Sequence, residues 1–147
     1  MIKNFLYKWL NIHPTAMSFR ETLDLTGLPI ITFKQGENKF HFILDTGSDV
    51  NVIDSNILDS IEHTMIDCNG TIYGADGVRV KASLCTITLE YKDKEYPFAY
   101  HIRDMKMAFD NLKKDHGVTV HGLLGSNFFN KYKYILDFKN LSAYSKE

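Results

Sequence analysis

One aspartate stands where an apolar run gives way to turn-forming residues. Asp45 follows the run 42–44 and precedes Thr46, Gly47 and Ser48. Glycine permits a tight turn, so the backbone N–H of Gly47 can approach the Asp45 carboxylate, and the Thr46 hydroxyl can bond a neighbouring backbone group. The four residues are also typical of an ordinary turn between two strands. For catalysis, such a turn would supply one rigidly held carboxylate, that of Asp45.

Two further segments of the sequence add to the signal at this aspartate. One is an apolar pair followed by glycine, and the other is a glycine-rich turn between two strand-like runs. In chain order the three segments resemble the retropepsin-like aspartic proteases, the single-lobe relatives of pepsin. In that family Asp-Thr-Gly is catalytic, a glycine-containing hairpin forms a flap over the cleft, and the apolar pair with its glycine passes beneath the catalytic turn. The matching residues are Asp45, Thr46, Gly47, Tyr73, Gly74, Ala75, Asp76, Gly77, Leu123, Leu124 and Gly125.

The resemblance implies a reaction that one copy of the chain cannot complete. Two carboxylates must face one water and share one proton, because like charges about 3 Å apart cannot both ionise. The chain holds one Asp-Thr-Gly, and Asp76, Asp115 and Asp137 stand in unlike settings. We therefore expect a homodimer with the cleft on its two-fold axis. It would hydrolyse polypeptide by general acid–base catalysis, with no metal or organic cofactor.

Ser48 and Tyr73 carry two finer predictions, each with an alternative. A Ser48 hydroxyl that donates to Asp45 would favour the ionised carboxylate and move the activity optimum towards acid; alternatively, Ser48 only completes the turn. Tyr73 before Gly74 resembles the flap of pepsins, which implies a hydroxyl near the cleft. The alternative for Tyr73 is a packing residue.

The two cysteines bear on the flap and on the redox compartment. If Asp76 and Gly77 are the two central residues of the flap turn, the hairpin register places Cys68 opposite Cys85, close enough for a disulfide. The alternative is two buried free thiols. Because two cysteines in 147 residues form no disulfide framework, we expect a reducing compartment and a cytoplasmic location.

Length and charge exclude several classes of protein. At about 150 residues per domain, 147 residues make one domain, and a two-lobed protease of the pepsin type is excluded. Lys and Arg number 17 against 18 Asp and Glu, so no basic footprint indicates nucleic acid. An amphipathic helix is predicted over 1–14, ended by Pro14; it would pack on the domain over 15–147 or on a second subunit. No membrane attachment is expected.

The remaining pattern is mainly β. Alternating and β-branched runs predict strands over 28–35, 39–45, 65–75, 78–91 and 95–103, and shorter patterns predict helices over 55–61, 107–115 and 126–131. With the resemblance, this indicates a retropepsin-like closed β-barrel or sandwich with a few short helices.

The leading interpretation of function is a homodimeric aspartic endopeptidase, of which an unassembled monomer would be an inactive state. The alternative is a retropepsin-fold module that binds peptides or dimerises without cleaving. Retention of Asp45, Thr46 and Gly47 together favours the enzyme, because a binder needs none of them.

Overall fold

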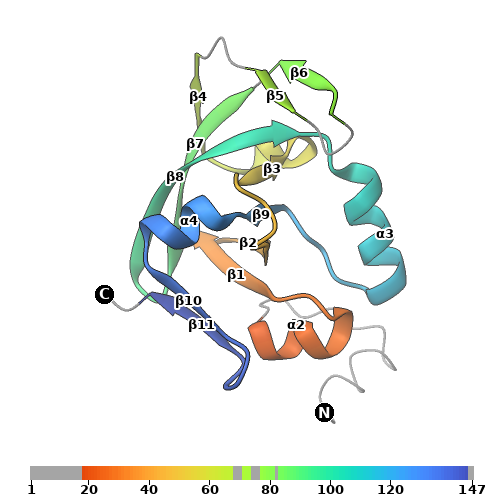
Figure 1. Ribbon diagram of the computed structural model, residues 1–147, viewed down its shortest axis with the longest axis vertical. Helices are drawn as coiled ribbons and strands as arrows, with labels where there is room; N and C mark the ends of the chain where they lie inside the picture. The colour runs from red at the N-terminus through yellow and green to blue at the C-terminus, as the bar shows by residue number, and fades with distance from the viewer. Residues whose placement is uncertain (1–17, 68–70, 74–76, 82, 146–147) are drawn as a thin grey trace.

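The computed structural model describes residues 18–67, 71–73, 77–81 and 83–145. Within these residues, six strands close into a barrel in the order β1-β2-β9-β3-β8-β7, and β4 extends the sheet at β7 (Figure 1). Lys34 of β1 lies opposite Glu90 of β7, which closes the ring. The strand bounds are β1 Ile30–Gln35, β2 Asn38–Leu44, β3 Val52–Asp54, β4 Thr64–Ile66, β7 Leu84–Tyr91, β8 Lys94–Arg103 and β9 Gly122–Leu124. The predicted fold class is confirmed.

The hairpin β1–β2 forms as its alternating pattern predicts. Phe40, Phe42 and Leu44 lie on one face of β2 and are buried inside the barrel. Gln35 pairs with Asn38 across the turn, and this register runs through the whole hairpin. The hairpin therefore delivers the chain to position 45 with a buried strand behind it.

Strand β9 lies between two strands that are neighbours in the sequence. It runs parallel to β2, with Leu44 opposite Leu124, and antiparallel to β3, with Val52 opposite Leu123. The chain leaving β2 must therefore loop out and return as β3 on the far side of β9. This crossing places the ends of three strands around residues 45–51.

Aromatic side chains fill the barrel. The ring of Phe33 makes edge contacts with Phe42, Tyr96 and Phe128 at centroid distances of 5.8, 6.1 and 6.3 Å. Phe128 comes from helix α4 (Ser126–Lys131), which packs its one buried residue onto this core. Gly125 is the N-cap of α4, and Ser126 is its first residue.

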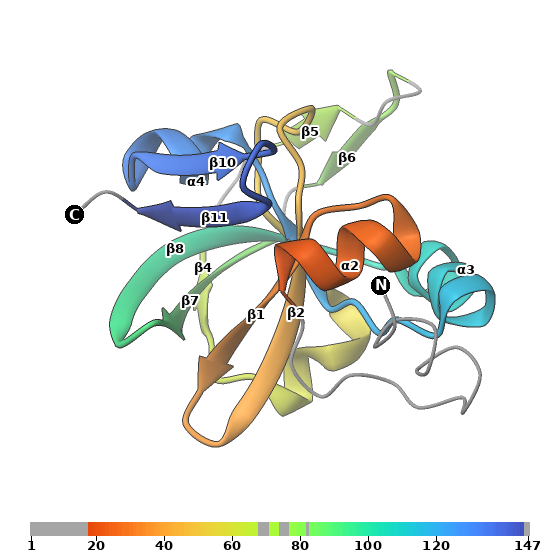
Figure 2. The same ribbon diagram turned by 90° about the horizontal axis from the view of Figure 1, so that it is seen from below.

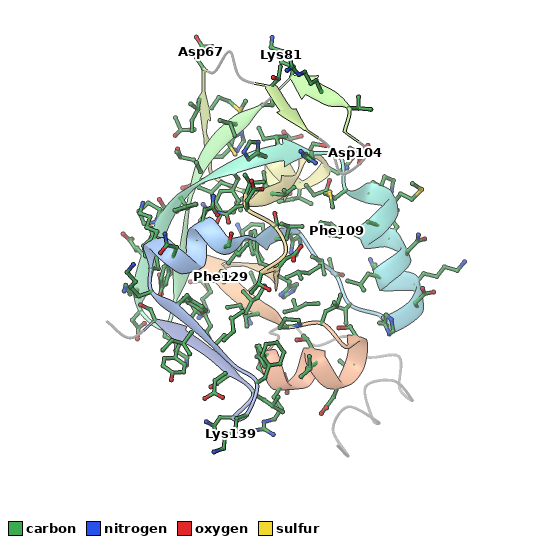
Figure 3. All side chains as sticks on the ribbon, viewed as in Figure 1. Asp67, Lys81, Asp104, Phe109, Phe129 and Lys139 are labelled. Atoms are coloured by element: carbon green, nitrogen blue, oxygen red, sulfur yellow. The ribbon has the colours of Figure 1, made fainter. Side chains whose placement is uncertain are left out.

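Two helices cover the outside of the barrel wall. Helix α2 (Phe19–Thr26) and helix α3 (Lys106–His116) bury Leu25 and Phe109 in a second apolar cluster with Val118 and Val120. Figure 3 shows Phe109 directed from α3 towards the barrel. The sequence analysis predicted α3 but not α2. In the described part of the chain no helix has the length and apolar character needed to cross a bilayer.

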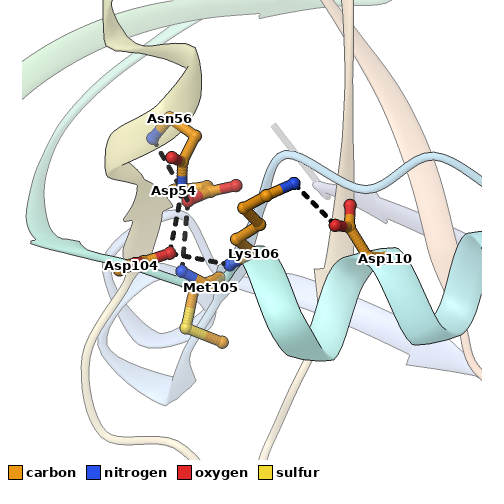
Figure 4. A network of polar contacts seen from close by, with 6 residues as sticks. All are labelled: Asp54, Asn56, Asp104, Met105, Lys106 and Asp110. Atoms are coloured by element: carbon orange, nitrogen blue, oxygen red, sulfur yellow. Dashed lines mark hydrogen bonds and ion pairs between the residues drawn. The ribbon is translucent and has the colours of Figure 1, made fainter.

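A buried carboxylate ties the end of β3 to the elements that follow it. Asp54 Oδ1 accepts hydrogens from the backbone N–H and the side-chain Nδ2 of Asn56, at 3.2 and 2.8 Å, and from the backbone N–H of Met105 at 3.1 Å (Figure 4). Asn56 belongs to the 3-10 turn η1 (Ser55–Ser60), and Met105 precedes α3. Asp54 thus anchors both helical segments to the barrel.

The C-terminal part forms a separate hairpin. Strands β10 (Tyr134–Asp137) and β11 (Ser142–Ser145) pair only with each other within the described residues. They lie outside the barrel, next to α4 (Figure 2). Phe138 in the loop between them is exposed, and one edge of its ring packs against Phe19 of α2.

The predicted strands over 65–75 and 78–91 each divide in two. Strands β5 (Thr71–Tyr73) and β6 (Arg79–Lys81) form a small hairpin of their own, with Tyr73 opposite Arg79. A two-residue Asp76-Gly77 turn would instead place Tyr73 opposite Val80, so the predicted register of this hairpin is wrong.

The predicted pairing of Cys68 with Cys85 is also wrong, because it assumed that one register runs through the whole hairpin. Cys85 of β7 lies opposite Met65 of β4, not opposite Cys68, and it is a buried free thiol. The loss of the expected register between the two halves of the predicted strands removes the basis for a disulfide. Cys68 itself, like the predicted helix over 1–14, lies outside the described residues.

Candidate active site

Asp45 is held at the end of β2 by its backbone and by one carboxylate oxygen. Its N–H donates to the carbonyl of Leu124 at 2.9 Å, and its carbonyl accepts from Ser48 N–H at 3.2 Å. Oδ1 accepts from Gly47 N–H at 2.9 Å. From the described residues, Oδ2 accepts no hydrogen bond, and the side chain is half-buried. The turn therefore fixes one oxygen and leaves the other available to water or to a partner group.

The residues after Asp45 face outward. Thr46 and Gly47 are exposed, and in the part of the chain described here the Thr46 hydroxyl makes no hydrogen bond. A Cβ on Gly47 would lie 3.2 Å from Asp45 Oδ1, so the glycine lets the backbone approach the carboxylate closely. The carboxylate and this turn thus share one accessible surface.

The loop after β9 passes directly beneath the Asp45 turn, at a distance that only glycine permits. A Cβ on Gly125 would lie 2.4 Å from the carbonyl oxygen of Val50 and 2.8 Å from that of Ser48. A Cβ on Gly122 would lie 2.4 Å from the carbonyl oxygen of Val52. Of the predicted supporting residues, Leu124 and Gly125 therefore lie against the Asp45 turn, while Leu123 pairs with Ile43 of β2 and Val52 of β3.

Comparison with known proteins bears on this arrangement. No family model matches the sequence, and no curated protein matches it. Among solved structures, the crystal structure of the retroviral protease-like domain of Ddi1 from Leishmania major is similar, with a TM-score of 0.54 at 10% sequence identity. The similarity covers 82% of this chain and 89% of that one. The fold is retropepsin-like. At this identity the likeness concerns the fold alone.

Asn51 is a residue of the candidate site that the sequence analysis missed. Its side chain is fully buried; Oδ1 accepts from Gly125 N–H at 2.8 Å, and Nδ2 donates to the carbonyl of Ala99 at 3.3 Å. The Asn51 carbonyl also accepts from His101 N–H at 2.9 Å. One amide thereby joins three strands beneath the Asp45 turn. The signal in the sequence was a lone amide between two valines, Val50 and Val52.

The prediction that Ser48 donates to Asp45 is wrong. The Ser48 hydroxyl donates to the carbonyl of Val50 at 2.7 Å and accepts from Val50 N–H at 3.3 Å. A hydroxyl has one hydrogen to donate, and here Val50 receives it. Ser48 completes the turn, which is the alternative considered from the sequence.

The predicted flap residues are only partly described. The backbone of Tyr73 pairs with Arg79 in the β5–β6 hairpin, and Gly77 has a left-handed φ of 77°. Gly74, Ala75, Asp76 and the Tyr73 side chain lie outside the described residues. In Figure 2 the β5–β6 hairpin projects from the same side of the barrel as the loop that follows β2. Its role as a flap stays a prediction.

A cavity lies away from Asp45. Its volume is about 480 Å³, and its lining is largely polar, including Lys34, Gln35, Glu62 and Glu90. It marks the place where β1 and β4 approach the same side of β7. Among the described residues no group of three or more His, Cys, Asp or Glu side chains is arranged to hold a metal ion.

Proposed function

We propose that this protein is a homodimeric aspartic endopeptidase in which Asp45 from each protomer acts on one shared water. The observation that carries the proposal is the Asp45 carboxylate itself. It stands at the strand crossing of a retropepsin-like fold, with Oδ1 fixed by Gly47 N–H and Oδ2 accepting no hydrogen bond from the described residues. A rigid, half-exposed acid at this point is what a shared catalytic pair requires.

The proposed reaction is general acid–base hydrolysis of a peptide bond. The ionised Asp45 accepts a proton from the water as the water attacks the scissile carbonyl, while the protonated Asp45 of the second copy donates a hydrogen bond to the developing oxyanion. The protonated group then supplies the proton that the leaving amine needs. Asn51 and Gly125 act on this step only by holding the turn that carries Asp45.

The exposed turn also supports the dimer. Thr46 has an exposed side chain whose hydroxyl forms no hydrogen bond with a described residue, and it lies next to the acid that must approach its copy. The hairpin β10–β11 carries two exposed large side chains, Phe138 and Tyr144, that offer a second contact. Substrate would be an extended polypeptide lying between the two copies under the β5–β6 hairpins.

The free thiol of Cys85 supports a cytoplasmic location.

One observation supports the alternative, a module that grips peptides without cleaving them. Strand β4 has β7 as its one strand partner among the described residues, and its other edge pairs with no described strand. Met65 on this strand is exposed. An extended peptide could add to such an edge as a further strand.

The test is cleavage of an unfolded polypeptide, with and without a pepstatin-like inhibitor, by the wild type, Asp45→Asn and the control Asp115→Asn. Asp115 is an exposed carboxylate at the end of α3. We expect Asp45→Asn alone to lose cleavage while its dimerisation, measured by ultracentrifugation, is unchanged. Cleavage by Asp45→Asn at the wild-type rate would remove Asp45 from the mechanism. Peptide binding without cleavage by the wild type would favour the alternative.

Mixing the two proteins tests whether the site is shared. When equal amounts of wild type and Asp45→Asn exchange subunits at random, only about one quarter of the dimers hold two intact aspartates. Activity should then fall to roughly one quarter of that of the same total amount of wild-type protein, whereas independent sites would keep about one half. The second result would contradict a site built from two copies.

A further inference from the structure

His41 directs both of its backbone groups at His121. The His41 carbonyl accepts from His121 N–H at 2.9 Å, and the His41 N–H donates to Nδ1 of the His121 ring at 2.8 Å. These two bonds stand at the start of the short parallel ladder between β2 and β9, which pairs only 42–44 with 122–124. The other end of that ladder is the bond from Asp45 N–H to Leu124. The His121 ring thus extends the register that holds Asp45.

The bond to the ring exists only when the ring is uncharged. An Nδ1 that accepts a hydrogen carries none, so the proton of neutral His121 lies on Nε2. An imidazolium has N–H on both nitrogens and can accept nothing. Protonation of His121 at Nδ1 must therefore break the bond and set its new N–H against the N–H of His41.

The surroundings oppose a charge on either ring. His41 is buried, its ring lies 5.2 Å from that of His121, and its Nδ1 lies 2.9 Å from the uncharged Thr32 hydroxyl of β1. Burial, then His121, then Lys39 on the same strand lower the pKa of His41 to about 4. Burial also lowers the pKa of His121, and Asp54 at the end of β3 opposes this shift.

We propose that His121 is a positioning residue that keeps the Asp45 strand in register only while its ring is neutral, so that mild acid disables the site. The inference rests on the proposed function and adds its pH range: an aspartic endopeptidase that works near neutrality and is bounded on the acid side. The protonation site is local to the β2–β9 ladder, and the effect reaches Asp45 through that ladder.

The direction of the pH effect on stability follows from whether the folded or the unfolded chain binds protons more readily. Both histidines take up protons more readily in the unfolded chain than in the folded one, because their pKa values are lowered by folding. For His41 the window runs from the ordinary pKa of 6.5 down to about 4. Stability is therefore fully present above this window and is lost as the pH falls through it. Activity that needs the folded ladder should decline in the same range.

The test compares the wild type with His121→Asn and the control His63→Asn. An asparagine oxygen lies where Nδ1 of histidine lies, so His121→Asn can still accept from His41 N–H but does not titrate. His63 Nδ1 lies 2.8 Å from the carbonyl of Ile61 and must donate, which a charged ring also does. The control therefore removes a histidine whose bond survives protonation.

The expected result is a shift confined to one variant. The acid midpoint of the activity profile should lie about one pH unit lower in His121→Asn than in the wild type, and the midpoint of His63→Asn should stay at the wild-type value. The pH at which the urea midpoint of unfolding begins to fall should likewise be lower in His121→Asn than in the wild type, and unchanged in His63→Asn. An acid limit equal in wild type and His121→Asn, or moved equally by His63→Asn, would overturn the proposal.

One further measurement is independent of cleavage and of variants. In wild-type protein at neutral pH, the ¹⁵N shifts of the His121 ring should identify Nε2 as protonated and Nδ1 as the acceptor. Protonated Nδ1 would overturn the proposal even if His121→Asn does not fold. A protein that cleaves nothing would refute the proposed function, while the ring shifts and the urea midpoints would still decide whether acid breaks this contact.

Discussion

The side-chain oxygen of Asn51 accepts the backbone hydrogen of Gly125 at 2.8 Å, across 74 positions of sequence. Both groups are buried, so water cannot replace either partner. The bond crosses the point where the chain leaving β2 and the chain leaving β9 pass each other. It therefore secures the crossing that presents Asp45.

Replacing Asn51 by Ala should destabilise the protein by about 2 to 4 kcal/mol, because Gly125 N–H and the Ala99 carbonyl both lose a buried partner. Urea unfolding measures this loss. The control is Asn111→Ala on the exposed face of α3, which should stay within about 0.5 kcal/mol of wild type. Equal losses of unfolding free energy in the two variants would show that the Asn51 hydrogen bonds stabilise the fold no more than an exposed amide does.

Gly125→Ala tests the close approach of the two chain segments. Its Cβ would lie 2.4 Å from the carbonyl oxygen of Val50, and we expect a loss of about 3 kcal/mol or a failure to fold. Gly36→Ala is the comparison, since Gly36 has a left-handed φ of 58° but open space around it. That change should cost about 1 kcal/mol. Thermal unfolding of both variants separates crowding from backbone strain, and equal losses would argue against crowding.

Ser48→Ala should weaken the turn without moving the pH dependence of activity. The hydroxyl bonds to Val50 at both its donor and its acceptor, so its removal should cost about 1 kcal/mol. Because it does not touch the Asp45 carboxylate, the activity optimum should stay at the wild-type pH. The pH–rate profile is the measurement, with Ser60→Ala at an exposed position as control. A shifted optimum would place the hydroxyl on the carboxylate in the working enzyme.

Cys85 should resist alkylation in the native protein. Burial raises the pKa of its thiol from 9.0 to about 11, which lowers the thiolate fraction near neutral pH by roughly 100-fold. Iodoacetamide labelling followed by peptide mass spectrometry measures the modification at this one position. We expect labelling only after unfolding in urea; rapid labelling of folded protein would mean that β7 opens locally.

Local elements were largely predictable because short-range rules decide them. The β1–β2 hairpin follows from alternating Phe40, Phe42 and Leu44, and the helical segments near 55–61, 107–115 and 126–131 follow from local patterns. Helix α2 was not predicted, although the sequence contains a helix-capping signal for it. Ser18 caps it by accepting from Glu21 N–H, a pairing that is visible in the sequence as serine followed three positions later by glutamate.

The flap region shows where local rules fail. An Asp-Gly pair predicts a two-residue turn that would place Tyr73 opposite Val80, but strands β5 and β6 pair with Tyr73 opposite Arg79. The predicted facing of Cys68 and Cys85 depended on extending a single register through both halves of the hairpin. The structure instead pairs Cys85 with Met65, because β4 and β7 belong to the barrel sheet while β5 and β6 form their own.

The residue types alone determined that this chain carries one acid in a glycine turn and a mainly β core, because turn chemistry and side-chain alternation act over a few positions. Tertiary structure alone decided which distant groups support that acid. Asn51 meets Gly125, and His41 meets His121, only because β9 is inserted between β2 and β3. Such contacts depend on how strands are ordered in the sheet, and no pattern local to either partner encodes that order.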